Sequence, residues 1–575
     1  VNQNISPYSY SCREKLFSTA IGNSSEKTVT LNDSLTGKTV DLATALNREP
    51  ANVLTMYVCG PTVYDAAHLG HARTYVQFDA IRRILQDLCG YKVAFFMNIT
   101  DVDDKIVNRA SEKGMDFKDL ALEHETSFFR DMELLGVEKP LFSPRCTDYM
   151  DEIVSFISRL EDSGLTYHGP ETGSVYFDTA KMESSGLSYG DLGTMNRGKA
   201  LEEHESVYME NSEIDEGIQG DKRSARDFAL WKIKDAQPCW PSPWGLGRPG
   251  WHSECSAMID ATAGTLRSDG CLDIHGGGID LRFPHHENER AQSQSLVCDS
   301  CKNWTSIFLH TGHLHIRGRK MSKSLKNFLT IEMALEGGDD YDFPVMSPRQ
   351  LRLLFLSQRY SAPMEFTTEA VQETLALDKQ FSEFFANTRI VLSQNGEDYN
   401  DHKICNKWTK IDATFVGVIS QGEEQIDIAL RNDFDIPRAL AQLRKVVKET
   451  NVYVNENESH PKLGAVRQAC QLVSKYLSIL GIGGGVSPFK CAVNGYDATL
   501  TFTNQSQARG EEIEVSQLLD ILTQFRADVR NSLRSENPKG EIFKLCDKLR
   551  DEDLMRLNVH LEDRKGRSIW KKNNK

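Results

Sequence analysis

The clearest pattern of hydrophobic and polar positions lies between residues 53 and 99. Val53 to Cys59 is a short apolar run that ends at Gly60-Pro61, which predicts a buried strand followed by a turn. Apolar residues then recur at helical spacing and stop before Gly90; they are Ile81, Ile84, Leu85 and Leu88. Val93 to Ile99 is almost continuously apolar, which is typical of a parallel strand covered on both faces. The pattern predicts a βαβ unit in an open α/β sheet, with a ligand site just beyond Cys59.

The pattern outside this unit is less regular. Residues 1 to 28 are polar and rich in Ser and Asn, so we expect a flexible extension rather than an organelle-targeting segment. Short runs from Val29 to Leu42 predict a hairpin. A helical pattern starts at Pro348 and continues through residues 366 to 480, before a break at Gly481 to Pro488. We therefore expect an α/β domain followed by an all-α region.

The composition limits the class of protein. A chain of 575 residues is too long for one hydrophobic core and predicts about three or four domains. No apolar run approaches the roughly 20 residues of a membrane helix, so we expect no membrane span. Thirteen widely spaced cysteines favour reduced thiols and a cytoplasmic protein. The net charge of −15 argues against indiscriminate polyanion binding, although a locally basic surface could still hold nucleic acid.

Four residues of types that bind metals lie far apart along the chain, between positions 59 and 289. They are Cys59, Cys255, His285 and Glu289. Ligands from distant segments indicate one Zn²⁺ ion held by a finished fold. His285 and Glu289 are four residues apart and share a helix face, whereas His286 points elsewhere and is expected to be structural. Without partners, His285 would also be interpreted as structural. The three other residues of metal-binding type favour a ligand role for it. Cys298 and Cys301 form a lone CxxC pair, which we interpret as ordinary thiols.

Two basic motifs have the chemistry of a phosphate site. His68-Leu69-Gly70-His71 enters a predicted helix, whose N-terminal N–H groups favour an anion. Lys320-Met321-Ser322-Lys323-Ser324 carries two ammonium groups that suit the charge on a leaving pyrophosphate. Taken alone, the first motif could be a structural or surface pair and the second a solvated basic turn. Asp101, Asp103 and Asp104 are interpreted as helix-capping residues rather than metal ligands.

The order of these two motifs resembles that of the class I aminoacyl-tRNA synthetases. Four further motifs resemble the cysteinyl-tRNA synthetase family; they are Tyr57 to Asp65, Asn98 to Lys105, Gly247 to Met258 and Asp273 to Glu289. The resemblance extends from about residue 29 to Trp570. It implies an α/β fold in which a Rossmann-like parallel-sheet catalytic domain with a connective insertion precedes an all-α C-terminal anticodon-binding region.

The resemblance also implies a reaction. L-cysteine would be activated by ATP to cysteinyl-adenylate and transferred to the 3′ end of tRNA(Cys), with Mg²⁺ accompanying ATP. One Zn²⁺ per chain, on the four ligands above, would select the cysteine thiolate, so no editing site is needed. The implied ATP-binding residues are His68, His71, Gly276, Gly277, Gly278, Asp280, Lys320 and Lys323, of which the two histidines and two lysines are catalytic. Cys59, Thr62 and Trp251 are candidate cysteine contacts; Thr62 is the weaker, and Trp251 could equally be a core residue.

Two alternatives share this catalytic half. A cysteine ligase with an amino-sugar acceptor is opposed by the long helical C-terminal region, which a small acceptor does not need. A non-catalytic tRNA- or zinc-binding homologue is opposed by the intact histidine and lysine motifs. The expected partners are tRNA(Cys), ATP and L-cysteine, and a monomer is only slightly favoured over an oligomer.

The expected domain boundaries combine the patterns with the resemblance. They are an extension (1–28), a catalytic domain (29–315) with a connective insertion (about 106–226) and an acidic loop (about 200–222), a lysine-loop and stem-contact region (316–365), a helical bundle (366–488), an insertion (489–512) and an anticodon-binding subdomain (513–575). The acidic loop and the 489–512 insertion depart from the family pattern. The basic tail at Lys571-Lys572 is either a tRNA contact or a frayed terminus.

Overall fold

The computed structural model describes most of the chain. The described residues are 28–46, 53–196, 220–297, 303–316, 318–320, 328–338, 342–394, 407–457, 461–482, short stretches between 521 and 533, 538–554, 559–564 and 567–572. Contacts divide the chain into two compact units, Val1–Asn494 and Gly495–Lys575, and each is described by itself. The N-terminal extension, most of the acidic loop, the CxxC pair and the 489–512 insertion lie outside the described residues.

The first unit is built around a four-stranded parallel sheet with the strand order β10-β9-β3-β4. The strands are β3 (Leu54–Val58), β4 (Val93–Met97), β9 (Leu272–Gly278) and β10 (Thr305–Thr311). Every residue of β3 is buried, as predicted for a strand covered on both faces. The chain passes from β3 to β4 and then crosses back to β9, so β3 and β9 flank the switch point where open α/β sheets bind ligands. This confirms the predicted βαβ unit.

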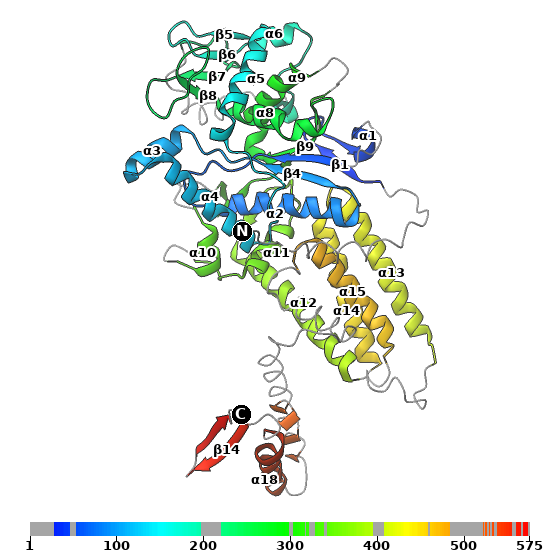
Figure 1. The fold of residues 1–575 in the computed structure, drawn as a ribbon. Coiled ribbons are helices and arrows are strands. Elements are labelled where there is room, and N and C mark those ends of the chain that lie inside the picture. The colour runs from blue at the N-terminus through cyan, green and yellow to red at the C-terminus, as the bar shows by residue number, and fades with distance from the viewer. Residues whose placement is uncertain are drawn as a thin grey trace, which may run out of the picture. The chain divides into compact units, whose positions relative to one another are not determined.

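Helices cover both faces of this sheet. Helix α2 (Leu69–Arg83) lies on one face and α8 (Trp251–Ala261) on the other (Figure 1). A π-helical turn, η1 (Ile84–Leu88), extends α2 towards Gly90. A Cβ at Gly276 of β9 would lie 2.5 Å from the ring of Phe78 on α2. The glycine therefore lets α2 approach the sheet closely.

A long insertion separates β4 from β9. Its elements are α3 (Asp104–Lys113), α4 (Phe117–Leu134), η2 (Cys146–Tyr149), α5 (Met150–Asp162), β5 (Thr166–His168), β6 (Val175–Phe177), α6 (Thr179–Ser184), η3 (Asp191–Asn196), β7 (Phe228–Ile233) and β8 (Gly247–Pro249). Strands β5 to β8 form an antiparallel sheet in that order. Residues of this sheet, such as Trp231, share one buried cluster with residues of the parallel sheet, such as Phe308. Asp103 caps α3 by accepting a hydrogen bond from the Lys105 N–H, as predicted.

The remaining elements of the catalytic half flank the parallel sheet. The predicted hairpin is β1 (Thr30–Asp33) and β2 (Lys38–Asp41), followed by α1 (Leu42–Leu46). The Asp33 carboxylate accepts a hydrogen bond from the backbone of Phe308, which ties this hairpin to β10. Between α8 and β10 the further elements are η4 (Ala263–Leu266), η5 (Ile279–Leu281), η6 (Arg282–His286) and α9 (Glu287–Gln294).

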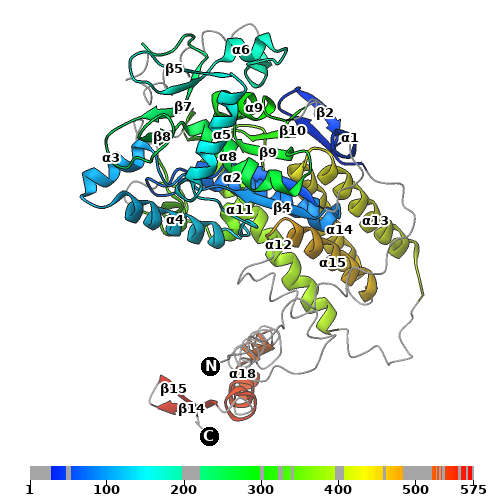
Figure 2. The ribbon, with the colours of Figure 1, turned by 45° about the horizontal axis from the view of Figure 1, so that its top comes forward.

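The first unit ends in a helical region, as predicted. A small sheet of β11 (Leu314–Ile316), β12 (Arg319–Lys320) and β13 (Met364–Phe366) accompanies α10 (Ile331–Glu336) and α11 (Pro348–Leu356). A bundle follows, formed by α12 (Thr368–Gln394), α13 (Lys410–Arg431), α14 (Ile436–Glu456) and α15 (Leu463–Ile479) (Figure 2). Pro437 lies in the first turn of α14, where proline is tolerated.

The second unit combines helix and strand. It contains α18 (Pro538–Lys548), η8 (Leu549–Asp553) and an antiparallel hairpin of β14 (Val559–Arg564) and β15 (Arg567–Lys572). Trp570, at which the family resemblance ends, is the cross-strand partner of Leu561. This hairpin was not predicted, although Gly566 between two short runs of the sequence was an available turn signal.

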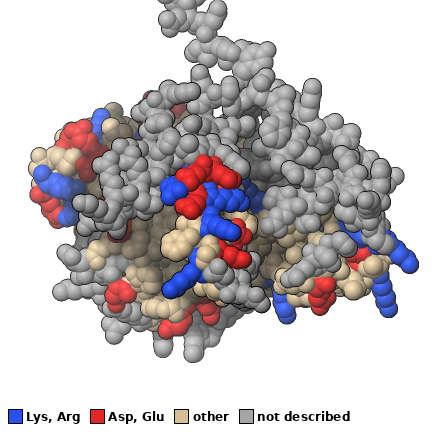
Figure 3. Space-filling view, turned by 90° about the horizontal axis from the view of Figure 1, so that it is seen from below, with Lys and Arg blue, Asp and Glu red and all other residues tan. Residues whose placement is uncertain are grey.

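The described surface carries both signs of charge. Lys and Arg side chains alternate with Asp and Glu on the described part of the face in Figure 3. Among the helices in the described ranges, none is both long and apolar enough to cross a membrane.

Candidate metal and nucleotide site

Four buried side chains meet beyond the carboxyl end of β3. They are Cys59, Cys255, His285 and Glu289, and their ligand atoms all lie within 4.8 Å of one another. Cys59 Sγ is 3.9 Å from Cys255 Sγ, 3.7 Å from His285 Nε2 and 3.5 Å from Glu289 Oε1. Tetrahedral zinc, with Zn–S of about 2.3 Å and Zn–N of about 2.0 Å, sets its ligand atoms roughly 3.2 to 3.8 Å apart. The structure thus brings together the four residues selected from the sequence. The three separations from Cys59 Sγ are close to this range, whereas His285 and Glu289 are in hydrogen-bond contact, which a metal ion bound between them would replace.

Local structure explains how these side chains are aimed. Cys59 directly follows β3, and Cys255 lies on α8. His285 and Glu289 sit one turn apart, with Nε2 and Oε1 separated by 2.6 Å, which confirms their shared helix face. Phe283 is extended, with φ −144° and ψ 130°, because it precedes a proline, and the helical path that carries both ligands restarts after it.

Two further histidines hold the metal-binding side chains in place. His275 Nε2 lies 2.7 Å from Glu289 Oε2, and His252 Nδ1 lies 2.9 Å from His285 Nδ1. Partners of this kind orient metal ligands. The Glu289 carboxylate accepts from His275, and a His285 that binds metal through Nε2 donates its Nδ1–H to His252. Both histidines lie within motifs of the family resemblance, but no role was predicted for them. For His252 the available signal was helical spacing, since it is three residues before Cys255.

A second set of possible ligands overlaps the first. Cys59 and Glu289 also lie within 4.8 Å of His275 and His286. The set with Cys255 is the better zinc site, because thiolate is the softer ligand and His275 is already engaged by the outer oxygen of Glu289. His286 instead places Nδ1 2.8 Å from His310 Nε2, in keeping with the structural role expected for it.

The electrostatics of the cluster suit a cation. A hydrogen bond from Cys59 lowers the pKa of the Cys255 thiol to about 7, whereas burial raises the pKa of Cys59 itself. Burial disfavours a charge on His285, but Glu289 and Cys255 together outweigh burial and raise the pKa of His285 to about 10. The donor set therefore contains a readily ionised thiol and a carboxylate whose pKa is held well below its usual range by His285 and His275 in spite of its burial.

The two candidate substrate contacts, Trp251 and Thr62, have different surroundings. The Trp251 ring stacks on His285, with centroids 4.2 Å apart and planes at 25°, and it is partly exposed. It therefore walls the metal cluster on a side that solvent reaches. Thr62 is held by a backbone bridge to Thr100, and its role as a substrate contact stays a prediction.

The histidine pair forms the N-terminus of α2. The His71 N–H donates to Nδ1 of His68 at 3.2 Å, the His68 N–H donates to Nδ1 of His71 at 3.5 Å, and the rings stack with centroids 3.6 Å apart. Burial lowers the pKa of His71 to about 4 and also lowers the pKa of His68, so both rings are neutral at pH 7. Because both Nδ1 atoms accept, each neutral ring carries its proton on Nε2. Two such donors at a helix N-terminus suit a phosphate.

The other nucleotide candidates surround this pair. Gly276 to Gly278 end β9, and the negative charge of Asp280 just beyond them acts on His71. The residues that follow the lysine loop are joined to the histidine motif, because the Leu69 N–H donates to the Leu329 carbonyl and the Phe328 ring meets the His68 ring edge-on. Lys320 ends β12, but its side chain and the whole of Lys323 lie outside the described residues.

The fold and this site define a class of protein. A family profile described as "tRNA synthetases class I (C) catalytic domain" matches residues 46–376. Among solved structures, the Mycobacterium tuberculosis methionyl-tRNA synthetase in complex with methionyl-adenylate is similar, with a TM-score of 0.53 and 16% identity over 75% of this chain and 91% of that chain. A ternary complex of the Agrobacterium radiobacter K84 LeuRS gives a TM-score of 0.52 and 13% identity, over 77% and 86% of the two chains. The catalytic half is therefore that of a class I tRNA synthetase.

Curated relatives identify the family within this class. The cytoplasmic cysteine–tRNA ligase of Dictyostelium discoideum is 37% identical over 553 residues, which are 95% of this chain and 78% of that protein. The cysteine–tRNA ligases of Encephalitozoon cuniculi and Methanococcus aeolicus are 35% and 36% identical, over 95% and 90% of this chain and 100% and 95% of those proteins. The chain belongs to the cysteine–tRNA ligase family. It is an enzyme, a ligase that attaches cysteine to tRNA.

Proposed function

We propose that the chain selects cysteine at the cluster of Cys59, Cys255, His285 and Glu289 and activates it beside the His68–His71 pair. The observation that carries this proposal is the buried cluster of two thiols, an imidazole and a carboxylate at the switch point of the parallel sheet. Its partly exposed wall, Trp251, supports access by a small substrate rather than a sealed structural site.

The proposed selectivity rests on ligand softness. Zn²⁺ held here would supply a soft cationic centre that accepts a thiolate far more readily than a hydroxyl. Rejection of serine by about ten-thousand-fold corresponds to roughly 5.5 kcal/mol, which the difference between a metal–sulfur and a metal–hydroxyl contact can supply. No editing step is then required.

The activation step needs positioning and charge stabilisation rather than a covalent catalyst. The cysteine carboxylate is itself the nucleophile towards the α-phosphate of ATP. We assign phosphate contacts to the Nε2–H donors of His68 and His71, which are neutral at pH 7. We assign the nucleoside to the end of β9, where Gly276 to Gly278 precede Asp280. Lys320 and Lys323 would balance the charge on the leaving pyrophosphate, and Mg²⁺ would accompany ATP.

The proposal also covers the tRNA acceptor, the cellular location and the oligomeric state. We assign anticodon recognition to the helical bundle and the second unit, within the domain boundaries given above. The names of the relatives support tRNA(Cys) as acceptor, and the label of the Dictyostelium discoideum relative supports a cytoplasmic location. A monomer is the proposed state, which light scattering would test.

Pyrophosphate exchange tests the function directly. Purified protein loaded with Zn²⁺ should exchange labelled pyrophosphate into ATP when L-cysteine is added, and at least a thousand-fold less efficiently with L-serine. It should also charge tRNA(Cys). An absence of exchange contradicts the activation step. Exchange followed by transfer to an amino sugar, but not to tRNA, would favour a ligase with a small acceptor.

A further inference from the structure

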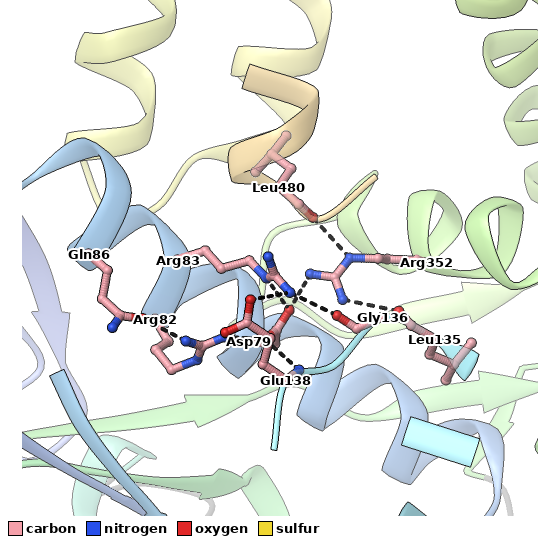
Figure 4. Close-up of polar contacts among 9 residues, drawn as sticks. All are labelled: Asp79, Arg82, Arg83, Gln86, Leu135, Gly136, Glu138, Arg352 and Leu480. Carbon is pink, nitrogen blue, oxygen red and sulfur yellow. Dashed lines mark hydrogen bonds and ion pairs between the residues drawn. The ribbon is translucent and has the colours of Figure 1, made fainter. Parts of the chain in front are cut away.

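One buried arginine joins four segments of the first unit at a distance from the reacting groups. Arg352 of α11 is 1% exposed. Its guanidinium donates to the Asp79 carboxylate of α2 at 2.5 Å, to the Leu135 carbonyl at 3.1 Å and to the Leu480 carbonyl at 2.9 Å (Figure 4). Leu135 and Leu480 are the C-cap residues that directly follow α4 and α15. Arg352 therefore caps two helix C-termini, where unpaired carbonyls and the helix dipole favour a cation.

Asp79 is the anionic centre of this network. It is 2% exposed and also accepts hydrogen bonds from Arg82 and Arg83, each at 2.7 Å, and from the Glu138 N–H at 3.1 Å. Burial disfavours its charge, but Arg352, Arg83 and Arg82 outweigh burial and hold the pKa of Asp79 below its usual range. The carboxylate of Glu138, on the surface, pairs with Arg82 and Arg83. The ionised Asp79 thus keeps three guanidinium groups in one place.

Two glycines allow the helix ends to reach the guanidinium. Gly481, just after α15, has a φ of +70°, and a Cβ there would lie 2.5 Å from Nη2 of Arg352. Gly136, just after α4, has a φ of +71°, and its carbonyl accepts a hydrogen bond from Arg83 at 3.0 Å. Both positions need glycine for their left-handed backbone, and Gly481 needs it for space as well. The turns are therefore built around the arginine.

Helix α2 links this network to the histidine pair. Arg73, two residues after His71, donates to carbonyls at the end of β10 and in the turn after α11, among them those of Gly312 and Ala362. Gln77 donates to the carbonyls of Phe355 and Gln358 at the end of α11. Asp79 lies eight residues beyond His71, about 12 Å along the helix at 1.5 Å per residue. Helices α2 and α11 are thus joined by polar contacts at Gln77 and at Asp79.

We propose that the Asp79–Arg352 pair is a positioning joint that holds the end of the α12–α15 bundle on the helix carrying His68 and His71. A tRNA bound on the bundle would then present its acceptor end correctly at the adenylate. The pair touches no substrate in this arrangement and acts through α2 and α15. This inference rests on the proposed function, in which the bundle binds tRNA.

The joint predicts a loss confined to the transfer step. Arg352→Lys keeps the charge but cannot reach Asp79 and both carbonyls in the planar geometry of a guanidinium. For this variant we expect kcat for tRNA charging to fall at least ten-fold, with KM for tRNA changed less than three-fold. Cysteine-dependent pyrophosphate exchange, which needs no tRNA, should stay within three-fold of the wild type. Single-turnover transfer from a preformed adenylate should slow by the same factor as kcat.

Two further variants keep the inference testable. Arg352→Gln is measured alongside, at a temperature at which its circular dichroism matches the wild type, because the loss of one of the three guanidinium partners of the buried Asp79 lowers stability. Arg145→Lys is the control, because Arg145 also pairs with a buried carboxylate, that of Glu125, but within the catalytic half. The control should affect exchange and transfer equally.

If the Arg352 variants lose pyrophosphate exchange and transfer to the same extent, the pair has a merely structural role and the proposal is overturned. Unchanged transfer would overturn it as well. If the wild type itself shows no exchange, the proposed function has failed, which is a separate result.

Discussion

At the scale of single residues, the metal cluster shows that each ligand depends on a neighbour. Glu289 turns one oxygen towards Cys59 and His285 and the other towards His275. The Cys255 thiol is prepared for ionisation by the hydrogen bond from Cys59. The chemistry of selection is therefore a property of the arrangement, which a change at one ligand should disturb as a whole.

Replacing Cys255 by serine tests this dependence. A serine hydroxyl is a poor ligand for Zn²⁺, so Cys255→Ser should lower the zinc content well below one per chain and reduce kcat/KM for cysteine by roughly 100-fold or more. Mass spectrometry of the metal and pyrophosphate exchange with cysteine and serine measure both effects. Cys239→Ser, at a partly exposed thiol outside the cluster, should change neither. Full zinc content with unchanged serine rejection would contradict the selector role.

The histidine pair predicts a pH dependence. The folded pKa of His71 is about 4, below the roughly 6.5 of an unfolded histidine, so the unfolded state binds more protons between these values. The associated stability is present above pH 6.5 and is lost as the pH falls towards 4; it amounts to about 3 kcal/mol for His71. A histidine NMR titration should show a neutral His71 ring down to about pH 5. In His71→Asn this part of the pH dependence should disappear; a ring that titrates near pH 6.5 would refute the assignment.

At the scale of elements, close approach decides how the site is assembled. Helix α2 must lie near β9 for the histidine pair to face the glycines that end that strand, and the contact between Phe78 and Gly276 has no space for a side chain. Periodicity predicted α2, whereas the residues of β9 were known only as part of a motif of the family resemblance. The contact between Phe78 and Gly276 sets how closely the two elements can approach.

Adding a methyl group at Gly276 tests that packing. Because the new Cβ would lie 2.5 Å from the Phe78 ring, Gly276→Ala should destabilise the protein by about 1 to 3 kcal/mol and slow pyrophosphate exchange. Gly464→Ala is the control, since a Cβ at this position in α15 meets no atom within 4 Å. It should leave stability unchanged or raise it slightly. Thermal unfolding and exchange rates distinguish the two, and a neutral Gly276→Ala would contradict the packing argument.

At the scale of the whole molecule, the chain consists of two units with separate internal contacts. Activation needs only the first unit in our proposal, whereas tRNA recognition uses both. The Asp79–Arg352 pair belongs to the first unit and connects the catalytic helix with the end of the bundle.

Removing the second unit separates these roles. A chain ending at residue 494 should remain folded and retain pyrophosphate exchange within roughly three-fold, because its domains keep their own cores. Charging of tRNA should fall by at least about ten-fold. Circular dichroism serves as the folding control. If the shortened and full-length chains charge tRNA equally well, the second unit has no role in tRNA recognition.

Much of this organisation was predictable from local sequence. The apolar run Val53–Cys59 and the helical spacing after it identified β3 and α2, and residue chemistry selected the four metal-binding side chains that the structure brings together. The roles of His252 and His275 were missed because they depend on which side chains lie behind the ligands. The hairpin of β14 and β15 was missed because short polar strands have a weak periodic signal.

The sequence by itself determined the types of element and the chemistry available, because backbone periodicity and side-chain reactivity are local properties. Only the tertiary structure decided the strand order, the approach of α2 to β9 and the meeting of Asp79 with Arg352, which are 273 positions apart. Such contacts depend on how distant segments pack together, and the spacing of two residues along the chain does not reveal that packing. The metal ligands could be named because each lies in a recognisable local motif. The pair that positions the bundle could not, because neither Asp79 nor Arg352 lies in such a motif.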